Sequence, residues 1–140
     1  SSYMYNKAAS LLHTIRQIIN DDSVFIKILR GLNSECYHKT VDSKDVEAYF
    51  SKIARIDLSK VFDQYLRTIK IPVLEYKKEG NKISYRWVNC VKDFDMPISI
   101  SGERAFWLSP KTEWQKIDLP LNYKMEDVNK NFYITLKEIK

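Results

Sequence analysis

The side chains that most often carry chemistry are scarce in this chain of 140 residues, which holds only two histidines, His13 and His38. A catalytic zinc ion needs three or four convergent ligands, commonly histidines together with a carboxylate. The two histidines stand 25 positions apart. The sequence therefore predicts no metal site in this chain. His13, next to an apolar position, is expected to make one hydrogen bond at the edge of the core.

A nucleophilic site is equally poorly supported. The two cysteines, Cys36 and Cys90, show no CxxC spacing and predict neither a disulfide framework nor a zinc site. We expect both to be buried or half-buried thiols. The chain has no GxSxG elbow and no glycine-rich phosphate loop, because it contains only three glycines.

Two further groups of residues have an ordinary structural explanation beside a functional one. Asp42, Asp45 and Glu47 form an acidic cluster that we interpret as partners of a helix start rather than as a catalytic pair. The three tryptophans are expected to pack in the core or pair across strands, although they also allow an exposed binding face. They are Trp87, Trp107 and Trp114.

The distribution of charged and apolar residues along the chain indicates which kinds of binding partner to expect. The net charge is +5, with 11 basic against 8 acidic residues up to Lys70 and 12 against 10 afterwards. A nucleic-acid-binding surface normally gathers its basic residues on one stripe, so the even spread argues against a nucleic-acid partner. No apolar run approaches the roughly 20 residues that cross a bilayer, so no membrane span is expected.

The elements that must position these residues change type near Lys70. All four prolines and all three tryptophans follow it. Before it, apolar residues recur at helical spacing in four stretches, and the last three are introduced by Asp or Ser residues that can cap a helix. The expected buried stripes are Leu11, Leu12, Ile15, Ile18 and Ile19; Val24, Phe25, Ile28, Leu29 and Leu32; Val46, Phe50 and Ile53; and Leu58, Val61, Phe62, Tyr65 and Leu66.

After Lys70 the hydrophobic pattern alternates with period two. Two extended runs flank Gly80, which predicts a hairpin, and four more short β-rich runs follow. The predicted fold class is α+β, with an N-terminal helical subdomain of about four short helices and then a small antiparallel β-sandwich.

The segment Tyr5-Asn6-Lys7-Ala8 opens the first helical stretch. It resembles the Tyr-x-Lys-Gly motif of the gluzincin zinc aminopeptidase family, the group that includes aminopeptidase N and leukotriene hydrolase. Ala8 stands where the family usually has Gly, a small-for-small change. Residues 42–76 also resemble the family's run of an acid-capped helix, a second helix and a strand that begins with Ile-Pro.

The resemblance implies a division of the chain and a place for it in a larger protein. Residues 1–70 would be the C-terminal part of a metallopeptidase catalytic domain, and residues 71–140 a β-sandwich domain. The family's HExxH zinc motif and its GxMEN motif would lie upstream. The chain would then be the C-terminal portion of a zinc-dependent aminopeptidase, inactive alone and without a zinc ion of its own.

In that family the tyrosine of the motif has a catalytic role, which the resemblance carries over to Tyr5. Its phenol would donate a hydrogen bond to the oxyanion that forms at the scissile carbonyl, a charge present only in the transition state. Lys7 is expected to support the helix start rather than touch substrate. Peptide substrates would be bound through the upstream domains.

Two alternatives stay open at this point. A non-catalytic relative would keep this architecture as a protein-interaction scaffold. A freestanding binding module would use the aromatic residues of the sandwich, and it requires all three tryptophans to be clustered and exposed. The sequence does not indicate a compartment or a preferred substrate residue.

Overall fold

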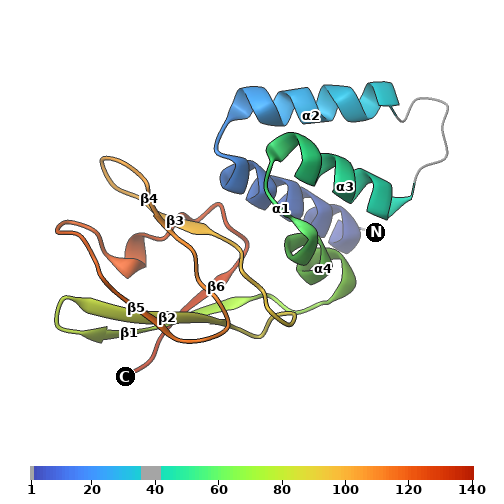
Figure 1. Ribbon diagram of the computed structural model, residues 1–140. Coiled ribbons are helices and arrows are strands. Elements are labelled where there is room, and N and C mark those ends of the chain that lie inside the picture. Colours follow the sequence, from blue (N-terminus) through green and yellow to red (C-terminus); the bar gives the residue numbers. More distant parts are fainter. Residues whose placement is uncertain (1, 36–41) are drawn as a thin grey trace.

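The helices gather at one end of the molecule and the strands at the other (Figure 1). The computed structural model describes the backbone of residues 2–35 and 42–140, and side chains from Lys7 onward within those ranges. Four helices are present in the described residues, as predicted. They are α1 (Ser2–Ile19), α2 (Asp22–Glu35), α3 (Ser43–Ala54) and α4 (Ser59–Arg67).

Aspartates cap the starts of α2 and α3, where the sequence places capping residues. Before α2, the Asp21 side chain accepts hydrogen bonds from the Ser23 and Val24 amides. Before α3, the Asp42 side chain accepts from the Asp45 amide, and the Asp45 side chain accepts in return from the Asp42 amide. This reciprocal capping box satisfies two amides that an isolated helix start leaves unpaired. The predicted role of Asp42 and Asp45 at a helix start is confirmed.

The predicted stripes are buried along their centres and exposed at one edge. Ile15, Ile28 and Phe50 lie in the core. Leu12, Leu29 and Leu66, predicted to be buried, are exposed, which corrects the prediction. Each follows a more central stripe residue by one position, and one step along a helix turns the side chain by about 100°.

Six strands follow, as the period-two pattern predicts. They are β1 (Val73–Glu79), β2 (Lys82–Val88), β3 (Ile98–Ile100), β4 (Phe106–Leu108), β5 (Gln115–Asp118) and β6 (Thr135–Glu138), with a 3-10 turn η1 (Met125–Asp127) before the last. Gly80 closes the β1–β2 hairpin with a φ of 67°, in the left-handed region that glycine adopts without strain.

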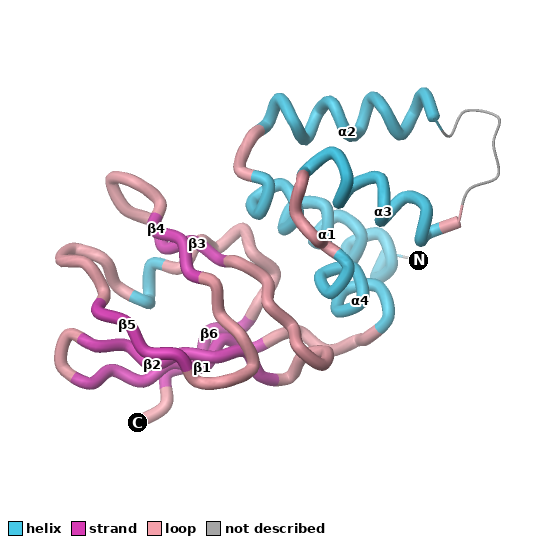
Figure 2. The backbone as a smooth tube through the Cα atoms, viewed as in Figure 1, coloured by secondary structure: helices cyan, strands magenta, loops and turns pink. Residues whose placement is uncertain are grey.

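The strands form a four-stranded sheet in the order β5-β2-β1-β6 and a separate β3-β4 hairpin. The α+β class is confirmed, but the main sheet is mixed rather than wholly antiparallel, because β6 runs parallel to β1 with Leu136 opposite Leu74. The chain between β5 and β6 crosses to the far edge of the sheet, as Figure 2 shows, and so returns in the direction of β1.

One continuous core joins helices and strands. Within it the Trp87 ring packs edge to face on Phe94, with ring centroids 5.2 Å apart, and its indole N–H donates to the Met96 carbonyl. Tyr65 of α4 belongs to the same core and donates its hydroxyl to the Tyr133 carbonyl at 2.7 Å. The helices are therefore held in a fixed place on the strands by both apolar packing and a buried hydrogen bond.

Candidate functional site

The residue with a predicted catalytic role, Tyr5, belongs to the first turns of α1. Its side chain lies outside the described residues, so its assignment stays a prediction. Lys7, two positions further on, is the first α1 residue whose side chain is described. The surroundings of Lys7 therefore define where the start of α1 sits.

Lys7 reaches across to the end of α4. Its ammonium donates a hydrogen bond to the Thr68 carbonyl, with 2.6 Å between Nζ and O. Thr68 is the C-cap of α4, where carbonyl groups lack helical partners and carry partial negative charge. A cation at this position is favourable, so Lys7 supports the start of α1 as the sequence predicted.

Thr68, which accepts that bond through its carbonyl, is itself held through its hydroxyl by the buried side-chain amide of Gln64. Gln64 is fully buried, and its Nε2 donates to the Lys70 carbonyl at 2.9 Å and to the Thr68 hydroxyl at 3.3 Å. Its Oε1 accepts the Val91 amide at 2.7 Å. One side chain thus ties the end of α4, the connection to β1 and the loop after β2.

Hydrogen bonds from α1 and α4 also hold the backbone of Tyr133, which precedes β6. The Thr14 hydroxyl accepts the Tyr133 amide at 3.1 Å, while the Tyr65 hydroxyl donates to the Tyr133 carbonyl. Thr14 is fully buried, and burial raises the pKa of Tyr65 far above its ordinary value. Tyr65 is therefore a structural hydrogen-bond donor and not a proton-transfer group near neutral pH.

Two adjoining hollows open beside the start of α1. Their lining includes Lys7, Ala8, Leu66, Ile69 and Lys70. Ile69 is 84% exposed, and Leu66 is exposed as well. This part of the surface therefore presents apolar side chains beside two lysines.

His13 and Glu47, which the sequence analysis singled out, both form hydrogen bonds within the fold. His13 Nε2 lies 2.9 Å from Asn131 Oδ1, which confirms the single hydrogen bond expected of it. Glu47 is buried and accepts from Arg67 and from the Ser43 hydroxyl. The Arg67 guanidinium, chiefly by hydrogen bonding, lowers the pKa of Glu47. Glu47 is an ionised structural group rather than a catalytic acid.

The described cysteine offers no activated nucleophile. Cys90 is half-buried, as expected, and burial raises the pKa of its thiol. A thiol with a raised pKa is mostly protonated near neutral pH, and the thiolate is the reactive form. Cys36 and His38 lie outside the described residues.

The tryptophans do not form one exposed face. Trp87 is buried in the core, whereas Trp107 and Trp114 are partly exposed. Lys77 and Arg86 flank the Trp114 ring, with the Arg86 guanidinium carbon 4.5 Å from the ring centroid. The predicted explanation by packing and cross-strand pairing holds for Trp87, and the cluster required of a freestanding aromatic binding module is absent.

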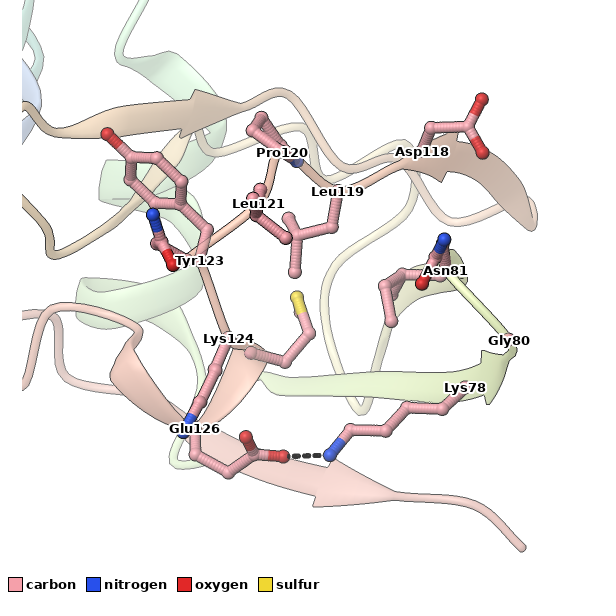
Figure 3. A pocket seen from close by; sticks show the side chains of 13 residues that line it. Lys78, Gly80, Asn81, Asp118, Leu119, Pro120, Leu121, Tyr123, Lys124 and Glu126 are labelled. Carbon is pink, nitrogen blue, oxygen red and sulfur yellow. Dashed lines mark hydrogen bonds and ion pairs between the residues drawn. The ribbon is translucent and has the colours of Figure 1, made fainter.

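A further pocket lies between the β1–β2 turn and the segment after β5 (Figure 3). Three of its four charged side chains have ion-pair partners: Lys78 points toward Glu126, and Asp118 pairs with Lys82. Tyr76 donates to Glu126, and burial together with this carboxylate raises its pKa to about 12.

No group of three or more His, Cys, Asp or Glu side chains within residues 7–35 and 42–140 could hold a metal ion. The zinc ion implied by the family resemblance therefore finds no ligand set among these side chains. No described helix is long and apolar enough to cross a membrane.

Sequence reasoning did not identify Gln64 or Thr14, the two buried polar residues that join helices to strands. A signal was present for both. Gln64 stands inside the apolar stripe of α4, next to Tyr65, and Thr14 directly precedes Ile15. A polar residue on a buried face needs a hydrogen-bonding partner, and such residues often join elements.

Comparison with known proteins gives a structural match and no sequence match. No family model matches the sequence, and no curated protein matches it. Among solved structures, the fold resembles part of Legionella pneumophila aminopeptidase A, crystallised in complex with aspartic acid. The TM-score is 0.70 at 14% sequence identity, and the match covers all of this chain. The chain spans 18% of that aminopeptidase, so it is similar in fold to a portion of an aminopeptidase.

Proposed function

We propose that this chain is the C-terminal portion of a zinc-dependent aminopeptidase that removes N-terminal residues from peptides. The observation that carries the proposal is the agreement between two independent features. The order of motifs from Tyr5 to Tyr76 resembles the gluzincin aminopeptidase family, and the whole fold matches part of an aminopeptidase with a TM-score of 0.70.

In this proposal residues 1–70 complete the catalytic domain and residues 71–140 form a small β domain. The zinc ligands and the general base would be supplied by residues upstream, since the described side chains provide no metal site. The zinc ion would supply Lewis-acid chemistry at the scissile carbonyl. Peptide substrates would be bound through the same upstream domains, and the 140-residue chain alone would be inactive.

Tyr5 is the catalytic residue that this chain contributes. A neutral phenol placed where negative charge develops stabilises the transition state more than the substrate. The assignment rests on the match of Tyr5-Asn6-Lys7-Ala8 to the motif of the family.

The proposal is tested with the full-length protein that carries this chain. We expect it to hydrolyse aminoacyl anilides but not their N-acetylated forms, to lose activity on chelation and to regain it with zinc. The separate 140-residue chain, assayed in parallel, is the control and should show no activity. Full activity in the presence of chelator, or an upstream sequence without HExxH, contradicts the proposal.

A further inference from the structure

We infer that Lys7 is a positioning residue for Tyr5, because its hydrogen bond to the Thr68 carbonyl fixes the start of α1 on the end of α4. The inference rests on the proposed function and goes beyond it. It assigns Lys7 a measurable effect on catalysis through the hydrogen bond that its side chain donates to Thr68.

The bond has the geometry of a strong anchor. The Lys7 ammonium lies 2.6 Å from the Thr68 carbonyl oxygen, and Lys7 is half-buried. A charge-assisted hydrogen bond is roughly twice as strong as a neutral one. The position at the C-terminus of α4 adds the attraction between a cation and the negative end of the helix dipole.

Thr68 is held by further hydrogen bonds, so its carbonyl cannot easily follow Lys7 if α1 moves. The Thr68 hydroxyl donates to the Gln64 carbonyl at 2.7 Å, and the buried Gln64 amide donates to both Thr68 and Lys70. Gln64 is in turn bonded to Val91 beside the sheet. Lys7 therefore attaches α1 to a rigid support that includes both halves of the molecule.

Within residues 7–19, Lys7 is the first α1 side chain to form a hydrogen bond across the fold. Among the described residues, the next α1 side chains to form hydrogen bonds across the fold are His13 and Thr14, almost two turns later. Helix ends fray unless side chains hold them. Tyr5 stands only two positions from Lys7, so the anchor limits how far the first turns can shift. A displacement of about 1 Å at a catalytic group can cost about 100-fold in rate.

The test is a double-mutant cycle in the full-length protein, with kcat and KM measured on an aminoacyl anilide. Lys7→Met should lower kcat by about 10- to 100-fold with little change in KM, because a misplaced Tyr5 affects only the transition state. In a Tyr5→Phe background the same substitution should change kcat by less than about twofold, since the group that it positions is already missing. Lys7→Arg, which keeps a cationic donor, should recover part of the loss.

Two further variants keep the result interpretable. Lys70→Met alters another lysine of the same hollow and should leave kcat unchanged. Lys7→Gln retains a shorter hydrogen-bond donor and serves as a second variant in case Lys7→Met folds poorly. Its loss of kcat should be smaller than that of Lys7→Met.

Three outcomes overturn the inference. Unchanged kcat in Lys7→Met beside a large loss in Tyr5→Phe removes the role of Lys7 and leaves the proposed function standing. An equal loss from Lys7→Met in both backgrounds shows that Lys7 does not act through Tyr5. Full activity of Tyr5→Phe removes the proposed catalytic role itself, and the role of Lys7 with it.

Discussion

At the scale of single residues, the buried amide of Gln64 determines how the two halves of the chain meet. Its two polar atoms bond to the backbone of Lys70 and Val91 and to the side chain of Thr68. These groups lie in connections rather than in regular helices or strands, so their backbone atoms depend on a side chain for partners. Gln64 supplies those partners from the centre of α4.

We predict that Gln64→Leu lowers the free energy of unfolding of the chain by about 2–4 kcal/mol. Leucine fills a similar volume, but it leaves the half-buried Val91 amide and the Lys70 carbonyl without their observed partners beside the core. Urea unfolding, followed by circular dichroism, measures the change.

Gln17→Leu is the matched control, because Gln17 is half-buried and accepts a single hydrogen bond, from Asn129. It should cost less than about 1 kcal/mol. Equal losses in the two variants would contradict the role given to Gln64.

At the scale of elements, an ion pair joins the start of α3 to the end of α4. The Arg67 guanidinium donates to Glu47, which is buried, and also to Asp63 on its own helix. A buried carboxylate without its partner is costly, whereas exposed pairs contribute little. The Glu47–Arg67 pair is therefore the part of this network that holds the two helices together.

This pair predicts a pH dependence of stability. The pKa of Glu47 is lowered from its ordinary value of 4.5, so the folded chain binds its proton less readily than the unfolded chain. The stabilisation is fully present above the unfolded pKa, near 4.5, and is lost as pH falls through the lower folded pKa. Glu47→Gln should cost about 2 kcal/mol at pH 7, and the cost should shrink as pH falls below 4.5, as measured by urea unfolding from neutral into acid pH.

Glu79→Gln is the control for the acid range. Glu79 pairs with Lys116 on the surface, and this pair lowers the pKa of Glu79 as well. Its exposed pair is screened by water and salt, so its removal should leave the pH profile almost unchanged. A Glu47→Gln variant with the wild-type acid profile would contradict the assignment.

The elements were more predictable from the sequence than their pairings. Stripes around Ile15, Ile28 and Phe50 predicted helices correctly because helical periodicity is a local property. The parallel pairing of β6 with β1 was not predictable in this way, since alternation in a strand is the same for both directions of pairing. That direction depends on where the long segment after β5 returns, which is a property of the whole fold.

At the scale of the whole molecule, the chain is a helical layer and a mixed sheet that share one core, and it resembles about a fifth of a larger enzyme in fold. The hydrogen bonds of Thr14, Gln64 and Tyr65 to the segments around the strands make the β part of the chain a support for the helices. The start of α1 is placed by that support, which connects the sheet to the proposed catalytic residue.

The candidate site was only partly predictable from the sequence. The spacing of His13 and His38 predicts no metal site, and this stays a prediction. The motif at Tyr5 and Lys7 indicated which residues to consider, but the partner of Lys7 is Thr68, 61 positions away. Contacts over such a distance are set by packing rather than by local pattern, so the anchor emerges only from the structure.

The most direct test of the account is the kcat of the full-length protein with Tyr5→Phe, compared with Tyr3→Phe. Both substitutions remove one hydroxyl from the same helix, and only Tyr5 matches the family motif. We predict a loss of about 100- to 1000-fold for Tyr5→Phe with little change in KM, and a change within about twofold for Tyr3→Phe. A Tyr5→Phe enzyme as active as the wild type would contradict the catalytic role on which the account depends.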